Sequence, residues 1–97
     1  FKTKVYLEDT DAYGIVYHAN YLKFFERART EFFLEKGFSL RSLLEEGIHF
    51  VVRDLAVRFS QPARLSDNLV VVTEIARVGA ASFEFNQRLL REPQEEL

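Results

Sequence analysis

One segment constrains the fold of this chain more than any other: residues 19–36 have the pattern of a long amphipathic helix. Apolar side chains recur there at i, i+3 and i+4 spacing, and Gly37 supplies a stop signal. At about 100° per residue, the apolar arc runs from Phe24 through Phe25 to Phe33, roughly half of the circumference. A surface helix usually has a narrower arc. We therefore expect a sheet to wrap this helix on one side and further structure to cover it on another.

Runs typical of β-strands precede and follow this helix. Residues 2–9 predict a short strand with Val5 and Leu7 on one face, and the Asp, Thr and Gly residues that follow it mark a turn. A second, short helix is expected at 39–46, with Ser39 as its cap. Three further β-like runs are 48–60, 68–78 and 81–91. This segregation of helices and strands favours an α+β domain with an antiparallel sheet over alternating βαβ units.

The composition fits one folded soluble domain and narrows the possible functions. Of the 97 residues, 47% are hydrophobic and 29% are charged. The chain has no Cys, which excludes disulfide scaffolds, Cys-type zinc sites and thiol nucleophiles. Its net charge of −2 argues against nucleic acid as the main partner, because phosphate binding needs a basic excess.

The sequence also carries expectations about location and chain ends. No apolar run approaches the roughly 18 residues of a membrane span, and no basic-then-apolar leader opens the chain, so we expect a cytoplasmic location. The chain starts at Phe1 without a Met and stops at Leu97 on a charged stretch, so we expect a longer native protein. A domain this small buries only about 60–65% of its unfolded surface, so a partner subunit would stabilise it.

The residues that could carry chemistry are concentrated in segment 8–21, between the first strand and the long helix. They are Glu8, Asp9, Asp11, His18 and Asn20. A helix start has free backbone N–H groups that can hold a carbonyl oxygen as it becomes an oxyanion. A carboxylate beside such a pocket could act as a nucleophile or as a general base for water. Gly14 would let the backbone pass close to a ligand.

Ordinary structural roles account for the same residues when each is taken alone. Asp9 and Asp11 fit turn residues, and Asn20 fits a helix N-cap. A single His18 is typical of a surface or an interface. The tyrosines of the segment, Tyr13, Tyr17 and Tyr21, fit core or interface aromatics. The spacing by itself leaves both interpretations open.

The order of residues in this segment resembles a known signature. The run Asp-Ala-Tyr-Gly-Ile-Val-Tyr-His-Ala-Asn-Tyr at 11–21, followed by Phe-Glu-Arg-Ala-Arg at 25–29, is similar to that of the hot dog fold acyl-CoA thioesterases. The branch it resembles is that of 4-hydroxybenzoyl-CoA thioesterase, and within it the bacterial YbgC-type, Tol-Pal-associated enzymes. The resemblance continues at 50–53 and 62–67, so it covers most of the chain in the right order.

The resemblance implies a hot dog fold, in which a curved antiparallel sheet wraps a long central helix. It further implies that strands of two subunits join edge to edge in a homodimer, often within a homotetramer, with active sites at the dimer interface. Family members usually have one more strand after the run that ends here near Arg91, and this sequence lacks it. A sheet without that strand would expose an unpaired edge.

The resemblance also assigns roles to the residues of the site. It makes Asp11 the catalytic carboxylate, which either attacks the thioester carbonyl or activates water. The thioester oxygen would lie at the helix N-terminus near the N–H groups of Tyr17 and His18, and the His18 side chain would contact Asp11 or the reacting centre, or act through its N–H alone. Tyr13, Gly14 and Tyr17 would contact the substrate. Tyr13 is bulkier than the small residue frequent there, so we expect it to favour short or flat acyl groups.

No cofactor and no metal are expected, because coenzyme A is part of the substrate and two His residues fall short of a ligand set. An acyl carrier protein in place of coenzyme A stays open. One or two basic side chains would contact the phosphates of coenzyme A, drawn from Arg53, Arg58, Arg64, Arg88 and Arg91. On the long helix, Glu26 is expected to pair with Arg29 and not to catalyse.

Two alternatives from other classes stay open. One is a non-catalytic module that binds acyl chains or takes part in cell-envelope organisation, which has no need for Asp11, Gly14 and His18 together. The other is a hot dog hydratase or dehydratase. Such enzymes use a helix-borne His or carboxylate, for which only Glu26 could serve here. The fold alone does not separate these activities.

Overall fold

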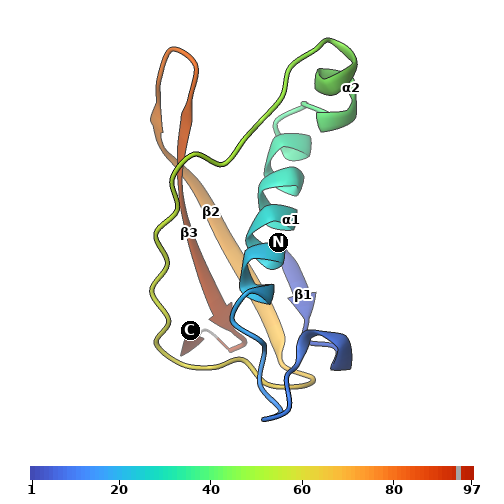
Figure 1. The fold of residues 1–97 in the computed structure, drawn as a ribbon, viewed down its shortest axis with the longest axis vertical. Helices are drawn as coiled ribbons and strands as arrows, with labels where there is room; N and C mark the ends of the chain where they lie inside the picture. Colours follow the sequence, from blue (N-terminus) through green and yellow to red (C-terminus); the bar gives the residue numbers. More distant parts are fainter. Residues whose placement is uncertain (94) are drawn as a thin grey trace.

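Helix α1 (Asn20–Glu35) lies against one face of an antiparallel sheet in the computed structural model of the chain (Figure 1). The structure describes residues 1–93 and 95–97. The sheet has strand order β1-β2-β3-β4, with β1 at Lys2–Lys4, β2 at Asn68–Val78, β3 at Phe83–Arg91 and β4 at Glu95–Glu96. A short helix, α2 (Leu40–Glu45), follows α1. The predicted α+β class with an antiparallel sheet is confirmed.

Both predicted helices form and end at their predicted stop signals. Gly37 and Gly47 follow α1 and α2 with φ angles of 89° and 82°, in the left-handed region that favours glycine. Ser39 caps α2, because its side chain accepts a hydrogen bond from the N–H of Ser42.

The core lies between α1 and the inward face of β2. Leu69 and Val71, two residues apart on β2, are buried in one cluster with Phe24 and Ala28 of α1. Because side chains alternate across a strand, this spacing places both β2 residues on the face that meets the helix. The predicted run 68–78 therefore forms a strand with the expected bounds, and β3 begins two residues later than expected, at Phe83.

The N-terminal strand is shorter than predicted. After β1, the chain leaves β2 and forms the 3-10 helix η1 (Leu7–Asp9). Val5 is buried, but Leu7 is 74% exposed, so the expectation that they share a face is wrong. The cause is the 3-10 turn, which breaks the two-residue alternation of a strand and turns Leu7 outward.

The strand predicted at 48–60 does not form. This segment instead follows the outside of β3 as an extended coil (Figure 1), and a hollow of about 510 Å³ lies beside Ala56, Phe85 and Arg88. Between residues 49 and 59, no backbone group hydrogen-bonds to another described residue. A strand needs a neighbour to complete its ladder, so β-type sequence alone leaves this segment unpaired.

Leu97 joins β3 to this coil. Its N–H donates to the Leu89 carbonyl at 2.9 Å, and its oxygen accepts from the N–H groups of Ser60 at 2.9 Å and Gln61 at 3.3 Å. The expectation that no strand follows the run ending near Arg91 is wrong: β4 pairs antiparallel with β3, with Glu95 opposite Arg91 and Glu96 opposite Leu90. Elsewhere the outer edge of β3 has no strand partner among residues 1–93 and 95–97.

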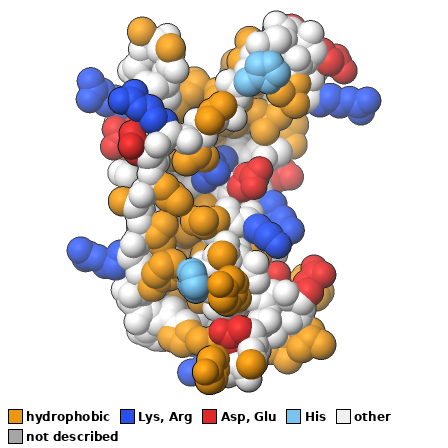
Figure 2. All heavy atoms as spheres, viewed as in Figure 1, with side chains coloured by type: hydrophobic (Ala, Val, Ile, Leu, Met, Phe, Trp, Pro, Cys, Tyr) orange, Lys and Arg blue, Asp and Glu red, His pale blue; other side chains and the backbone are white. Residues whose placement is uncertain are grey.

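The coil presents a band of large apolar side chains to solvent. Its exposed members are Phe50, Val51, Val52, Leu55, Val57 and Phe59. Figure 2 shows hydrophobic side chains gathered along this face of the molecule. Two of these rings also pack on α1, Phe50 on Phe33 at 5.3 Å between ring centroids and Phe59 on Tyr21 at 5.4 Å.

Candidate active site in the loop before the central helix

Asp11 lies in a tight turn that holds its carboxylate at the surface. Its Oδ1 accepts a hydrogen bond from the N–H of Tyr13 at 2.7 Å, and its backbone oxygen accepts from the N–H of Gly14 at 3.2 Å. Gly14 has a φ of 77°, which an L side chain adopts only with strain. Within residues 1–93 and 95–97 Oδ2 has no hydrogen-bond partner, so one carboxylate oxygen is available for chemistry.

The carbonyl oxygen of Asp9 holds the two ends of this loop together. It accepts the N–H of Tyr17 at 3.1 Å and the side-chain amide of Asn20 at 3.0 Å. The Asp9 side chain is buried, with 8% of the residue exposed, and its Oδ2 accepts the N–H of Tyr6 at 2.9 Å. We call the Asp9 carbonyl and its two donors, Tyr17 N–H and the Asn20 amide, the Asp9 clasp.

The start of α1 leaves backbone donors free. Ala19 is the N-cap residue, and no side chain caps it. Among the described residues, the N–H groups of His18 and Ala19 have no hydrogen-bond acceptor. These amides carry the partial positive charge of a helix N-terminus, which can stabilise an oxyanion.

Two expectations about the helix start are wrong. Asn20 is not the N-cap but the first residue of α1, and its side chain reaches back to Asp9. The N–H of Tyr17 is already hydrogen-bonded to Asp9, so it is not free for a substrate oxygen. Both corrections have one cause: the Asp9 carbonyl lies close enough to accept donors that the sequence pattern assigned elsewhere.

The side chain of His18 packs on Tyr17. Their ring centroids are 4.5 Å apart at an interplanar angle of 43°, and both residues are exposed. No hydrogen bond or ion pair joins His18 to Asp11 in the described part of the chain. Tyr13 is 86% exposed, so its ring fills no part of the core. The predicted catalytic and substrate-binding residues thus share one loop, on which the side chains of Tyr13, Tyr17 and His18 are exposed.

The predicted pair between Glu26 and Arg29 does not form among the described residues. Arg29 Nη1 donates instead to Gln87 Oε1 at 3.0 Å. The amide of Gln87 in turn donates to the carbonyl of Phe25 at 2.9 Å and to Thr73 Oγ1 at 3.0 Å. This network links α1 to the sheet. Sequence reasoning missed Gln87 because it lies 58 residues from Arg29.

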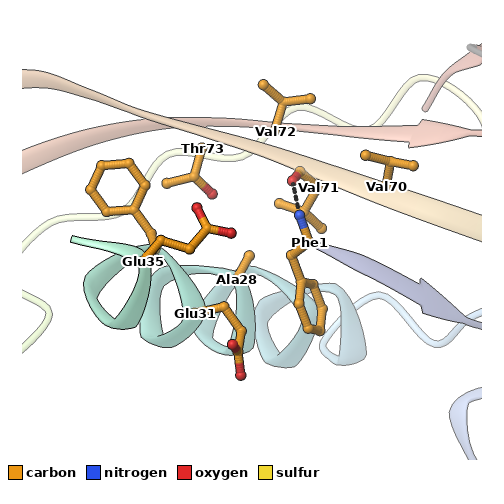
Figure 3. A pocket seen from close by; sticks show the side chains of 9 residues that line it. Phe1, Ala28, Glu31, Glu35, Val70, Val71, Val72 and Thr73 are labelled. Atoms are coloured by element: carbon orange, nitrogen blue, oxygen red, sulfur yellow. Dashed lines mark hydrogen bonds between the residues drawn. The ribbon is translucent and has the colours of Figure 1, made fainter. Parts of the chain in front are cut away.

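A separate hollow of about 260 Å³ lies between α1 and β2 (Figure 3). Glu31 and Glu35 line its helix side, and Val71 and Thr73 line its strand side. The N-terminal ammonium of Phe1 donates to the Val71 carbonyl at 3.1 Å. None of its lining residues belongs to segment 8–21, so this hollow is distinct from the candidate site.

Two general features bear on cofactors and membranes. Residues 1–93 and 95–97 contain no cluster of three or more His, Asp or Glu side chains arranged to hold a metal ion. No described helix is long and apolar enough to cross a bilayer.

Comparison with known proteins agrees with this architecture. The chain matches the Thioesterase superfamily over residues 13–97. It is 51% identical over 92 residues to the acyl-CoA thioesterase YbgC of Haemophilus influenzae, covering 94% of this chain and 68% of that protein. It is 48% identical over 87 residues to the acyl-CoA thioester hydrolase YbgC of Escherichia coli O6:H1, covering 90% of this chain and 65% of that protein. The chain thus spans about two thirds of the length of these relatives.

A solved structure shows the same fold. The crystal structure of a probable thioesterase from Bartonella henselae matches with a TM-score of 0.92 and 41% identity, over 100% of this chain and 81% of that one. The predicted hot dog fold and the predicted resemblance to YbgC-type enzymes are both confirmed. The chain belongs to the thioesterase superfamily and is an enzyme of the thioester hydrolase class.

Proposed function

We propose that this protein hydrolyses acyl-CoA thioesters to a free acid and coenzyme A, with Asp11 as the reacting carboxylate. One observation carries the proposal: Asp11 keeps a free carboxylate oxygen in a fixed turn, on the loop that leads to the free amides of the α1 start. Relatives named acyl-CoA thioesterases support the substrate class.

The thioester carbonyl oxygen would bind the N–H groups of His18 and Ala19, since that of Tyr17 is engaged by Asp9. Asp11 would then act in one of two ways. Its carboxylate oxygen attacks the thioester carbon to give a mixed anhydride that water hydrolyses, or it removes a proton from the attacking water. In both routes the carbon–sulfur bond breaks and the thiolate leaves. A thiol pKa of about 8.5 makes the thiolate a good leaving group without a strong general acid.

The substrate contacts follow from the same loop. Tyr13 and Tyr17 expose their rings on either side of the turn that Gly14 makes, and they supply apolar surface for the acyl or pantetheine part. An Arg side chain would meet the phosphates of coenzyme A. Arg53 is more than nine-tenths exposed and pairs with its neighbour Asp54, so it is free to reorient. Arg91 is held by Asp67 at 3.0 Å, which makes it a poor candidate.

A homodimer is part of this proposal. The exposed apolar residues of the 48–60 coil and its unpaired backbone support pairing with a second copy. We place the enzyme in the cytoplasm, which fractionation of cells would test.

The hydratase alternative finds less support. It needs a carboxylate on the central helix, for which Glu26 is exposed on α1, but the relatives at 51% and 48% identity are named as thioester hydrolases. The non-catalytic alternative has no use for a Gly14 turn that holds Asp11.

The test is hydrolysis by the purified protein of acetyl-, butyryl-, octanoyl-, palmitoyl- and benzoyl-CoA, followed by release of the thiol. We expect turnover of at least one of them at 1 s⁻¹ or more, on the order of a typical enzyme. If a folded dimer released no thiol from any of them, acyl-CoA would not be the substrate. Acyl carrier protein thioesters, assayed in parallel, would then separate a different carrier from a binding role.

A further inference from the structure

The Asp9 clasp suggests a role for Asn20 that the catalytic scheme does not include. Its side-chain nitrogen lies 3.0 Å from the Asp9 carbonyl oxygen, across 11 residues of chain. The same oxygen accepts the N–H of Tyr17 at 3.1 Å. A single carbonyl therefore ties the chain before Asp11 to the first turn of α1.

The segment between the two ends of this clasp carries the groups that act together in the proposed reaction. Asp11 follows Asp9 by two residues, and His18 follows Tyr17 by one. The clasp therefore limits how far the carboxylate of Asp11 can move from the amides of His18 and Ala19. Asn20 itself sits at the base of the loop, and its donor is used inside the protein.

The hydrogen bond from Asn20 to the Asp9 carbonyl contributes more to the position of the loop than to the stability of the fold. The loop is attached to the fold by other bonds as well, because Thr10 pairs with Val16 and the Val16 N–H donates to the Ala63 carbonyl at 2.9 Å. Helix α1 keeps its core contacts through Phe24 and Ala28, whatever the first side chain does. Loss of the Asn20 amide therefore leaves the fold in place but loosens the segment with the His18 and Ala19 amides relative to Asp11.

We propose that Asn20 is a positioning residue for thioester hydrolysis: through the Asp9 carbonyl, its side-chain amide fixes Asp11 relative to the free amides at the start of α1. This inference rests on the proposed function, because the distance between Asp11 and the N–H groups of His18 and Ala19 matters only if all of them act on one substrate. A small misplacement of a catalytic group is enough to slow a reaction strongly.

The decisive variant is Asn20→Leu, which keeps the approximate size of the side chain and raises its helix propensity but removes the hydrogen-bond donor. We expect kcat to fall on the order of tenfold or more, with KM within about twofold of wild type. Asn20→Gln, which keeps an amide donor on a side chain one methylene longer, should recover part of the lost kcat. Asn86→Leu is the matched control, because Asn86 is exposed on β3 outside the loop, and it should behave as wild type.

Hydrogen exchange gives a readout that does not depend on activity. The N–H of Tyr17 shares the Asp9 carbonyl with Asn20, so it should exchange about tenfold faster in Asn20→Leu and unchanged in Asn86→Leu. Thermal unfolding should shift little in any of these variants.

Several outcomes would overturn the inference. Wild-type kcat in Asn20→Leu, together with unchanged exchange at Tyr17, means that the clasp holds nothing in place. A raised KM at constant kcat means that Asn20 contacts substrate. A loss of kcat that only matches the unfolded fraction means a structural role. If wild type releases no thiol from any acyl-CoA, the proposed function fails, and the exchange rate at Tyr17 alone decides whether the clasp exists.

Discussion

The hydroxyl oxygen of Tyr21 accepts a hydrogen bond from the backbone N–H of Ala63 at 2.9 Å, and both residues are buried. The carbonyl of Ala63 accepts the N–H of Val16, also at 2.9 Å. Ala63 thereby connects the loop that carries Asp11 to the first turn of α1, although it lies 42 residues beyond Tyr21. The position of the candidate site thus depends on a distant loop.

Tyr21→Phe should destabilise the protein by about 1–3 kcal/mol, because the N–H of Ala63 would be buried without an acceptor. Urea unfolding followed by circular dichroism measures the change. Tyr13→Phe removes the same hydroxyl from an exposed ring and should change the free energy of unfolding by less than about 0.5 kcal/mol. Equal effects of the two variants would show that the bond to Ala63 contributes nothing.

Gly14→Ala should reduce activity more than stability. The added Cβ meets no atom within 4 Å, so its cost is the φ of 77° alone, about 1–2 kcal/mol. Relief of that strain would move the turn that holds Asp11 and lower kcat on the order of 10- to 100-fold. Gly47→Ala is matched, with a φ of 82° and no atom within 4 Å, but lies far from segment 8–21.

Gly47→Ala should therefore lose a similar amount of stability and keep its activity. Parallel urea unfolding and acyl-CoA hydrolysis of the two variants measure both quantities. The account of the turn is wrong if Gly14→Ala retains full kcat, or if both variants lose activity equally.

Tyr13→Ala should broaden the range of acyl groups without affecting the fold. The ring of Tyr13 is 86% exposed, so its loss should cost less than about 0.5 kcal/mol of stability. Removal of its bulk beside Asp11 should raise kcat/KM for long-chain acyl-CoA relative to short-chain acyl-CoA by about tenfold. An unchanged order of preference over an acyl-length series would show that Tyr13 does not select the substrate.

Val51→Lys should weaken the proposed homodimer, because Val51 is 86% exposed in the 48–60 coil and a charge there would oppose apolar pairing. Val78→Lys places the same charge on a 64% exposed Val in β2, outside the coil, and should leave the dimer intact. Sedimentation equilibrium distinguishes the two. A wild-type monomer at high protein concentration would contradict the proposed dimer, and an intact Val51→Lys dimer would place the interface elsewhere.

The features that could be predicted from the sequence are those that depend on residues close together in the chain. The spacing of apolar residues and the glycines at 37 and 47 set the bounds of α1 and α2 to within a residue. The turn at Asp11 and Gly14 was likewise visible as local chemistry.

What could not be predicted depends on partners distant in the chain. The 48–60 run has β-type residues, but the sequence cannot show whether another strand lies beside it, and here none does among the described residues. Asn20 satisfies the rules for an N-cap, yet a carbonyl 11 residues earlier captures its side chain. The same holds for Arg29, whose nearby Glu26 was the expected partner and whose observed partner is Gln87.

The most direct test of the account compares Asp11→Asn with wild type in acyl-CoA hydrolysis, using Glu46→Gln as a control on an exposed carboxylate outside the loop. Asn keeps the acceptor for the Tyr13 N–H but can neither attack the thioester nor take a proton from water. We predict that kcat falls by about a hundredfold or more in Asp11→Asn, with unchanged thermal unfolding, and stays at the wild-type value in Glu46→Gln. Activity that survives in folded Asp11→Asn would show that the chemistry lies on another residue.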